Sequence, residues 1–135
     1  MIRYLDGATV KSGDVLKKWL AAINGHDVEA LVELMTPDFV FVNSVGNRVD
    51  GARAMEPGWR NYFTMCPDYW IRTDLIMSDG DTLLLAGEAG GTIDGQPWET
   101  PAAWKAVTRG AAVAEWRVFA DNKPVYEILK RRRSS

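Results

Sequence analysis

Apolar side chains recur at helical spacing in the first half of the chain. Within residues 12–24 this spacing predicts a helix, with Ser12 as its N-cap. Asp27 is the expected N-cap of a second short helix, which residues 36–38 bring to an end. A short apolar strand is predicted next, over residues 39–43.

A third helix is predicted after a turn at residues 43–47, with Asp50 as its N-cap. Its apolar face consists of Met55, Trp59, Phe63 and Cys66. Pro57 and Gly58 lie inside this segment and predict a kink or a late start, because proline removes a backbone donor. Pro67 ends the helix.

The second half of the chain has the alternation that is typical of strands. Four strands are predicted, at residues 69–77, 82–93, 97–107 and 111–119. Gly-containing turns separate them and predict hairpins. Gly87, Gly90 and Gly91 lie inside the second of these strands and indicate a bend, as a strongly curved sheet requires.

The chain ends with a predicted helix and a basic run. The helix is expected to start at Asp121 or Asn122 and to continue through Leu129, and residues 130–135 are expected to form a frayed basic tail. With no internal repeat and no linker, residues 1–135 are expected to form one domain. Helices followed by strands indicate the α+β class, with helices covering one face of a curved antiparallel sheet and enclosing a pocket.

Composition narrows the classes of partner. The net charge of −2 gives no electrostatic reason to expect nucleic acid. No apolar run approaches the ~20 residues of a membrane span, and the N-terminus does not resemble a signal peptide. The single cysteine, Cys66, excludes an internal disulfide framework and fits a reducing cytoplasm. No cluster of metal-ligating residues is evident, so neither a metal nor another cofactor is expected.

Six tryptophans are the unusual feature of the composition. Strand alternation places Trp98, Trp104 and Trp116 on inward faces, and Trp19 and Trp59 lie on the apolar stripes of the first and third helices. This arrangement fits a solid core, and it equally fits an apolar cavity for a flat ligand.

Two polar residues are candidates for chemistry in such a cavity. Glu88 lies among small residues, and on the concave face its carboxyl would have a raised pKa suited to acid/base catalysis. On the opposite face it would be a solvent or dimer-interface charge. Asn43 ends the first strand and could orient a ligand oxygen or a water, or else begin an Asx-type turn. His26, the only histidine, lies in the turn between the first two helices and is expected to be exposed.

From about Val15 to Val125 the chain resembles the nuclear-transport-factor-2-like superfamily, specifically its SnoaL-like and ketosteroid-isomerase-like enzymes. The residues that carry the resemblance are 15–24, 26–31, 37–41, 59–63 and 67–68, and the Gly110 turn that leads into residues 114–119. The resemblance implies a cone-shaped α+β half-barrel. It does not fix an activity, because this fold hosts isomerases, cyclases, dehydratases, hydrolases and binding modules.

Compared residue by residue, the chain lacks the family's best-known catalytic groups. Trp19 is found where the isomerases have an oxyanion-hole tyrosine, and Asn43 where they have the general base. Members similar to limonene epoxide hydrolase hold water with an asparagine and a tyrosine. Asn43 matches the first, but Phe41 replaces the tyrosine, and Glu88 is the only ionisable residue at the positions of their Asp-Arg-Asp set. That comparison favours Glu88 facing the pocket.

The sequence therefore predicts a SnoaL-like small-molecule enzyme without a cofactor, which transfers protons as an isomerase, cyclase or dehydratase does. Glu88 would be the acid/base and Asn43 the orienting amide. The indole N–H groups of Trp19, Trp104 or Trp116 would be hydrogen-bond donors. The substrate, apolar or aromatic, would contact Trp19, Phe41, Trp59, Tyr62, Phe63, Trp98, Trp104, Trp116 and Val118. The alternatives are a non-catalytic binding or dimerisation module, and a hydrolase in which Glu88 and Asn43 activate water. A homodimer through the outer sheet face is expected from the resemblance.

Overall fold

A computed structural model describes residues 4–5 and 10–134. In chain order the elements are β1 (Tyr4–Leu5), α1 (Val10–Asn24), α2 (Val28–Leu34), β2 (Met35–Val42), β3 (Arg48–Asp50), α3 (Ala52–Met65), β4 (Trp70–Asp79), β5 (Thr82–Ile93), β6 (Gln96–Arg109), β7 (Ala112–Ala120) and α4 (Lys123–Ser134). The predicted succession of helices and then strands is confirmed.

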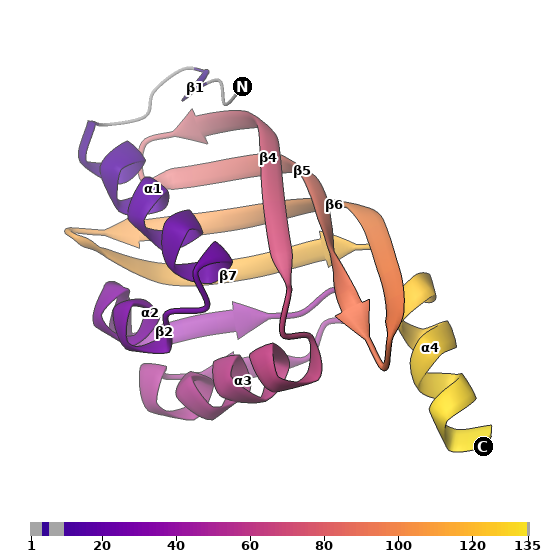
Figure 1. Ribbon diagram of the computed structural model, residues 1–135. Helices are drawn as coiled ribbons and strands as arrows, with labels where there is room; N and C mark the ends of the chain where they lie inside the picture. Colours follow the sequence, from indigo (N-terminus) through magenta and orange to yellow (C-terminus); the bar gives the residue numbers. More distant parts are fainter. Residues whose placement is uncertain (1–3, 6–9, 135) are drawn as a thin grey trace.

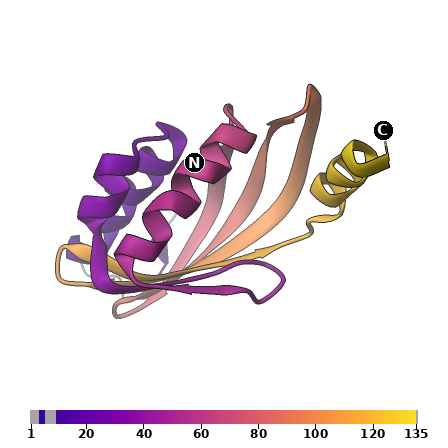
Figure 2. The same cartoon turned by 90° about the horizontal axis from the view of Figure 1, so that it is seen from below.

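The strands form one curved sheet in the order β1-β4-β5-β6-β7-β2-β3. Strands β4 to β7 pair as successive antiparallel hairpins, whereas β2 pairs with β7 in parallel. Helices α1, α2 and α3 cover one face of the sheet, and β5 and β6 bend strongly at one end (Figures 1 and 2). The structure thus confirms the predicted α+β cone, with its interior between these helices and the concave face.

The hairpins of the second half follow the predicted turns closely. Gly80, Gly95 and Gly110 all have positive φ, as tight turns require. Gly87 has a different role, because it lies opposite an irregularity in the pairing of β4 with β5, between Thr73 and Leu75. A Cβ atom built on Gly87 would lie 1.8 Å from the carbonyl oxygen of Arg72, so only glycine allows this close approach of the two strands.

The start of the first helix differs from the prediction. Helix α1 begins at Val10, so Ser12 lies within the helix and is not its N-cap. The Ser12 hydroxyl is buried and bonds instead to Oγ1 of Thr108 at 2.9 Å and to the Asp81 carboxylate at 3.1 Å. These bonds fix the first turn of α1 to the hairpin ends. The predicted cap at Asp27 is confirmed, since its carboxylate accepts from the Ala30 amide.

The first strand and the third helix also begin elsewhere than predicted. Strand β2 starts at Met35, and Pro37 lies in the stretch where its pairing with β7 is interrupted, which is where a strand tolerates proline. Asp50 ends β3 and pairs with Arg48, so it does not cap α3. The cap is Gly51, with φ of 97°, and α3 continues through Pro57 as one helix.

Helix α4 contacts β6 beside the bent end of the sheet (Figure 1). Val125 and Ile128 are buried, and the Thr100 hydroxyl donates to the Asp121 carbonyl at 2.8 Å just before the helix. The helix continues to Ser134, so residues 130–134, predicted as a frayed tail, are helical. Residue 135 lies outside the described residues.

Two side chains attach the turn between α1 and α2 to the start of β4. Asn24 bonds the Ile71 backbone twice, accepting from its N–H at 2.8 Å and donating to its carbonyl at 3.1 Å. His26 donates from Nε2 to the Tyr69 carbonyl at 2.7 Å and stacks on Phe63 with 4.4 Å between ring centroids. His26 is therefore half-buried and structurally engaged, not simply exposed as predicted.

Candidate functional site

The centre of the concave face is an aromatic cluster around Trp19. This fully buried indole lies 5.7 Å from the rings of Phe39 and Trp59 and 5.8 Å from that of Trp116. Trp104 stacks on Trp116 at 6.1 Å. Helical spacing brings Trp19 and Trp59 to this point from α1 and α3, and strand alternation brings the other rings from the sheet.

From Trp59 a row of ring contacts continues toward the bent end of the sheet. Trp59 contacts Phe63 at 5.8 Å, Phe63 contacts Tyr69 at 6.5 Å, and Tyr69 contacts Trp98 at 6.2 Å. Tyr62 meets Tyr69 edge to face at 4.8 Å. We call Trp19, Trp59, Phe63, Tyr69 and Trp98 the aromatic row. It connects α1, α3, the residue just before β4, and β6 through the interior.

Three indoles of the aromatic row have a buried N–H without an acceptor. Nε1 of Trp19, Trp59 and Trp98 is hidden from solvent and has no hydrogen-bond partner. The Cys66 thiol, a weak acceptor, lies near Trp98, but no well-aligned hydrogen bond joins them. A buried donor without an acceptor costs about 1–3 kcal/mol, so three in one cluster is an uncommon arrangement.

The two tyrosines of the interior keep their protons. Burial raises the pKa of Tyr69 far above its ordinary value, and nearby Tyr62 and Cys66 add to the effect. The pKa of Tyr62 is also raised, first by burial and then by Cys66. Both phenols are therefore hydrogen-bond donors over the whole physiological range, and neither is a base.

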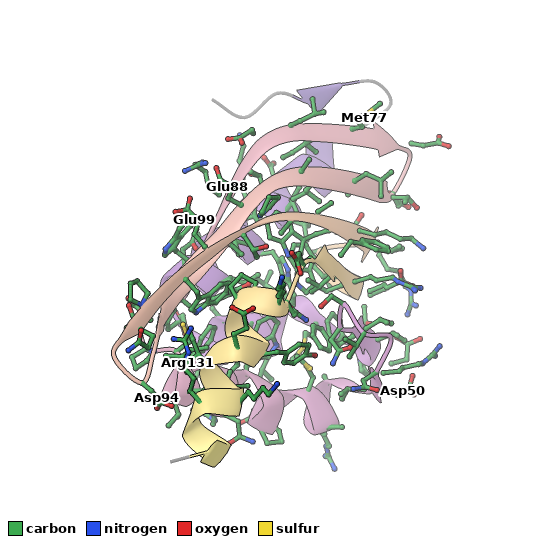
Figure 3. The ribbon with its side chains drawn as sticks, turned by 90° about the vertical axis from the view of Figure 1, so that its right-hand side faces the viewer. Asp50, Met77, Glu88, Asp94, Glu99 and Arg131 are labelled. Atoms are coloured by element: carbon green, nitrogen blue, oxygen red, sulfur yellow. The ribbon has the colours of Figure 1, made fainter. Side chains whose placement is uncertain are left out.

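Glu88 lies on the outer face of the sheet, so the prediction that it faces the interior is wrong. Along β5 the side chains of Leu83, Leu85 and Ala89 are buried, whereas Leu84, which shares the face of Glu88, is 53% exposed. Alternation then fixes Glu88 outside. Figure 3 shows Glu88 and Glu99 on the convex side of the arch.

Charged side chains interact with Glu88 on that outer face. Its carboxylate pairs with the Arg72 guanidinium on β4, which also pairs with Asp74 at 3.4 Å and lies over the Trp70 ring. A hydrogen bond with Glu88 raises the pKa of Glu99 on the neighbouring strand. Glu88 thus belongs to a surface ion-pair network, and the desolvation that would have suited it to acid/base catalysis is missing.

Asn43 is a turn residue, which is the second of the two roles that the sequence allowed. Its Oδ1 accepts from the backbone N–H of Val45 at 3.1 Å and of Asn47 at 2.9 Å, closing the loop between β2 and β3. Strands β6 and β7 lie between β5 and β2 in the sheet. The strand of Glu88, β5, is therefore three inter-strand spacings, or roughly 14 Å, from β2, which Asn43 follows. The structure therefore does not bring the two predicted catalytic residues together.

The nine predicted substrate-contacting residues all belong to the interior apolar cluster. Trp19, Trp59, Phe63, Trp98, Trp104 and Trp116 are buried, and Phe41, Tyr62 and Val118 are partly buried and packed against them. The hollows that the structure shows lie elsewhere. One hollow of about 400 Å³ lies between Val45 and α4, and another of about 580 Å³ lies between α1 and α2. A third lies on the outer face of the sheet. Ligand binding by the interior residues remains a prediction.

Phe39, Tyr69 and His26 contact the interior cluster but were not among the residues predicted to contact the substrate. The signal for Tyr69 was its parity, because it alternates with Ile71 and Thr73, both of which are buried. His26 gave no such signal, since its stacking on Phe63 depends on a left-handed backbone with φ of 52°.

Within residues 4–5 and 10–134, no group of three or more His, Cys, Asp or Glu side chains is arranged to hold a metal ion. No helix in the same part of the chain combines the length and apolar character needed to cross a membrane. Among the described residues the buried polar side chains are Ser12, Thr36, Thr73, Thr100 and Thr108, so no carboxylate lies inside the cone.

Comparison with known proteins supplies the family. Residues 16–126 match the SnoaL-like domain. The chain belongs to the SnoaL-like domain family. The resemblance inferred from sequence is thereby confirmed for most of the chain. No curated protein matches the sequence significantly.

Solved structures support the same fold at low sequence identity. A putative SnoaL-like polyketide cyclase from Jannaschia sp. CCS1 is 19% identical, with a TM-score of 0.77 over 86% of this chain and 89% of that one. A limonene-epoxide-hydrolase-like enzyme of M. tuberculosis is 18% identical, with a TM-score of 0.76 over 90% and 84%. A ketosteroid-isomerase-like protein of Catenulispora acidiphila, in complex with trimethylamine, is 22% identical, with a TM-score of 0.72 over 78% and 84%. At these identities the likeness concerns the fold alone.

Proposed function

We propose that this SnoaL-like protein binds an apolar or aromatic small molecule in the interior of its cone, against the aromatic row. The observation that carries the proposal is the interior itself. Rings from two helices and several strands converge there, and none of the buried side chains in the described part of the chain is a carboxylate. Such a wall suits a flat apolar ligand.

The proposal departs from the enzyme predicted from sequence at one point. Proton abstraction by Glu88 requires a carboxylate next to the substrate, but Glu88 pairs with Arg72 on the outer face. Water activation by Glu88 and Asn43 meets the same obstacle. The non-catalytic binding module, the alternative left open by the sequence, therefore has more support than either reaction.

Titration with a panel of flat aromatic molecules, followed by tryptophan fluorescence, tests this function. We expect saturable quenching with one ligand per chain, because the ligand would contact several indoles. Trp70 lies outside the aromatic row, so Trp70→Phe is the matched control and should bind as the parent does. If no apolar aromatic compound binds saturably, the proposed function is wrong.

An enzyme of the cyclase or isomerase type, which stabilises a negative substrate oxygen through phenol hydrogen bonds, is the second candidate, and the interior tyrosines favour it. Burial keeps the pKa of Tyr62 and Tyr69 high, so each stays protonated and can donate a hydrogen bond to a substrate oxygen at neutral pH. Tyr69→Phe would then abolish turnover of an identified substrate while ligand binding persists. Turnover that survives in both single phenylalanine variants would exclude this candidate.

We also propose that the outer face of the sheet pairs with a second copy of the chain. Met77, Leu84 and Phe119 are each about half exposed there, beside a hollow of about 180 Å³ with an apolar lining. Exposed apolar clusters of this kind mark association surfaces. Sedimentation should show a dimer that Leu84→Ser weakens. A monomer at micromolar concentration would contradict the proposal.

A further inference from the structure

Asn24 is the one asparagine in the chain that glycine follows. In an Asn-Gly sequence the asparagine side chain is readily lost to deamidation, because glycine has no Cβ to hinder the attack of its own backbone nitrogen. A larger residue follows each of the other asparagines, which are Asn43, Asn47, Asn61 and Asn122. The chain therefore contains one position at which its own backbone is well suited to modify a side chain.

The reaction at this position needs no partner other than water. The backbone nitrogen of Gly25 attacks Cγ of Asn24 and gives its proton to solvent, and the side-chain nitrogen takes up a proton and leaves as ammonia. A succinimide ring then joins the two residues. Water opens this ring at either of its two carbonyl groups, which yields aspartate or isoaspartate at position 24.

In the folded chain both reacting groups are engaged elsewhere. Asn24, the last residue of α1, accepts the Ile71 N–H at 2.8 Å with Oδ1 and donates from Nδ2 to the Ile71 carbonyl at 3.1 Å. The Gly25 N–H donates to the Ala21 carbonyl at 2.9 Å, which is the next bond of the helical ladder. The side chain is thus held by β4, while the nitrogen that would attack it is held by α1.

Hydrogen bonds, and not exclusion of water, protect this pair of residues. Asn24 and Gly25 both lie at the exposed surface. The turn between α1 and α2 must open before the side chain and the backbone nitrogen can meet. His26 also holds this turn closed, since its Nε2 donates to the Tyr69 carbonyl at 2.7 Å and its ring stacks on Phe63. Reaction therefore proceeds only from the small fraction of molecules in which the turn is open.

We propose that Asn24–Gly25 is a self-modification site, which the native fold keeps unreactive and which opening of the α1–α2 turn activates. The proposal does not depend on a ligand in the cone. Either product lacks the Nδ2 donor, so a carboxylate oxygen would face the Ile71 carbonyl oxygen. Isoaspartate also adds a methylene group to the backbone where α1 ends. A chain that has reacted once therefore refolds with a weaker attachment of this turn to β4.

Peptide mapping by mass spectrometry, on native and urea-unfolded protein in the same mildly alkaline buffer, tests the proposal. In urea, Asn24 should convert faster than the other asparagines. In the native protein its conversion should be slower by about a hundredfold or more, because only the open fraction reacts. Equal rates in the two states would overturn the proposal. A rate in urea no faster than that of the other asparagines would overturn it as well.

Two variants test the attacking nitrogen and the protecting turn separately. Gly25→Ala, followed in urea so that its folding does not matter, should lower the rate at Asn24 to that of the other asparagines. His26→Ala, followed without urea, should raise the rate about tenfold, since one net hydrogen bond changes an opening equilibrium by about that factor. If His26→Ala does not fold, it should react at the rate seen in urea. Arg48→Ala, which breaks a surface pair on β3, is the matched control and should react as the parent does. An unchanged rate in His26→Ala would show that the turn does not protect the site.

Asn24→Asp reproduces one product and tests the consequence for the fold. It should lower Tm by about 4 °C, because the bond to the Ile71 carbonyl is lost. Asn61→Asp, at an exposed position of α3, is the matched control and should leave Tm nearly unchanged. Equal Tm values for Asn24→Asp and the parent would overturn the inferred weakening of the turn.

Discussion

The inner and outer faces of the sheet carry side chains of very different character. On the inner face, the fully buried Trp19 and Trp104 belong to a continuous aromatic cluster, and the buried polar side chains of the described residues include hydroxyls but no carboxylate. On the outer face, Arg72, Asp74 and Glu88 form ion pairs beside an exposed apolar patch at Met77 and Leu84. Adjacent residues of the same strand thus meet entirely different environments.

This difference shows that the charged residues of β4 to β7 do not serve the interior. A carboxylate gains a raised pKa by burial, and the outer face gives its carboxylates partners and solvent instead. Under the proposed function, the indole and phenol donors would be among the polar groups that a ligand in the cone meets. Each of the following changes tests one side of that division.

Removing a ring from the centre of the inner face should have the largest effect. Trp19→Ala should destabilise the fold by about 3–5 kcal/mol, since it leaves a large cavity among Phe39, Trp59 and Trp116. Urea unfolding measures the loss. Phe119→Ala on the outer face, where the ring is 47% exposed, should cost about 1 kcal/mol or less. Equal losses would mean that the two faces are not distinct.

A methyl group added between the neighbouring strands β4 and β5 should have the next largest effect. Gly87→Ala places a Cβ against the Arg72 carbonyl and should destabilise by about 1–3 kcal/mol or more. In Gly58→Ala, on α3, the added Cβ meets only the Met55 side chain, so that variant should be stabilised by about 0.5–1 kcal/mol. Opposite signs are expected in the same unfolding experiment. A tolerant Gly87 would show that the sheet does not need this close approach.

The buried phenols should resist titration at alkaline pH. Because folding raises the pKa of Tyr62 and Tyr69, their contribution to stability is complete below about pH 10 and declines above it, as unfolded tyrosines lose protons first. Absorbance at 295 nm should show that Tyr62 and Tyr69 ionise only well above pH 10. Tyr62→Phe should remove one of the late transitions. Titration of all the tyrosines near pH 10 would contradict the burial of this pair.

Neutralising the outer carboxylate should have the smallest effect. Glu88→Gln breaks the pair with Arg72 and should change stability by about 1 kcal/mol or less, because exposed ion pairs contribute little. The pKa of Glu99 should fall toward its ordinary value, since the hydrogen bond with Glu88 is what raises it. NMR titration of Glu99 follows the change. A loss of several kcal/mol would place Glu88 in the interior after all.

Periodicity was sufficient to predict most of the fold. The predicted bounds of β5, residues 82–93, agree with the structure, and the inward faces of Trp98, Trp104 and Trp116 are confirmed. Glu88 was placed wrongly for a physical reason. Alternation shows which residues share a face, but only the packing of helices decides which face is inside. Of the indole donors expected from sequence, at Trp19, Trp104 or Trp116, only Trp19 is among those without an acceptor, because the orientation of a ring depends on neighbours distant in sequence.

The parallel pairing of β2 with β7 has a consequence for synthesis of the chain. Phe41 aligns with Trp116, and Met35 with Val113. One edge of β2 therefore stays unpaired until β7 is available. Pairing between strands so far apart in the sequence forms slowly, because a long loop must close first. During translation α1, α2 and α3, with Trp19, emerge well before residues 112–120, so the interior stays open until β7 has been synthesised.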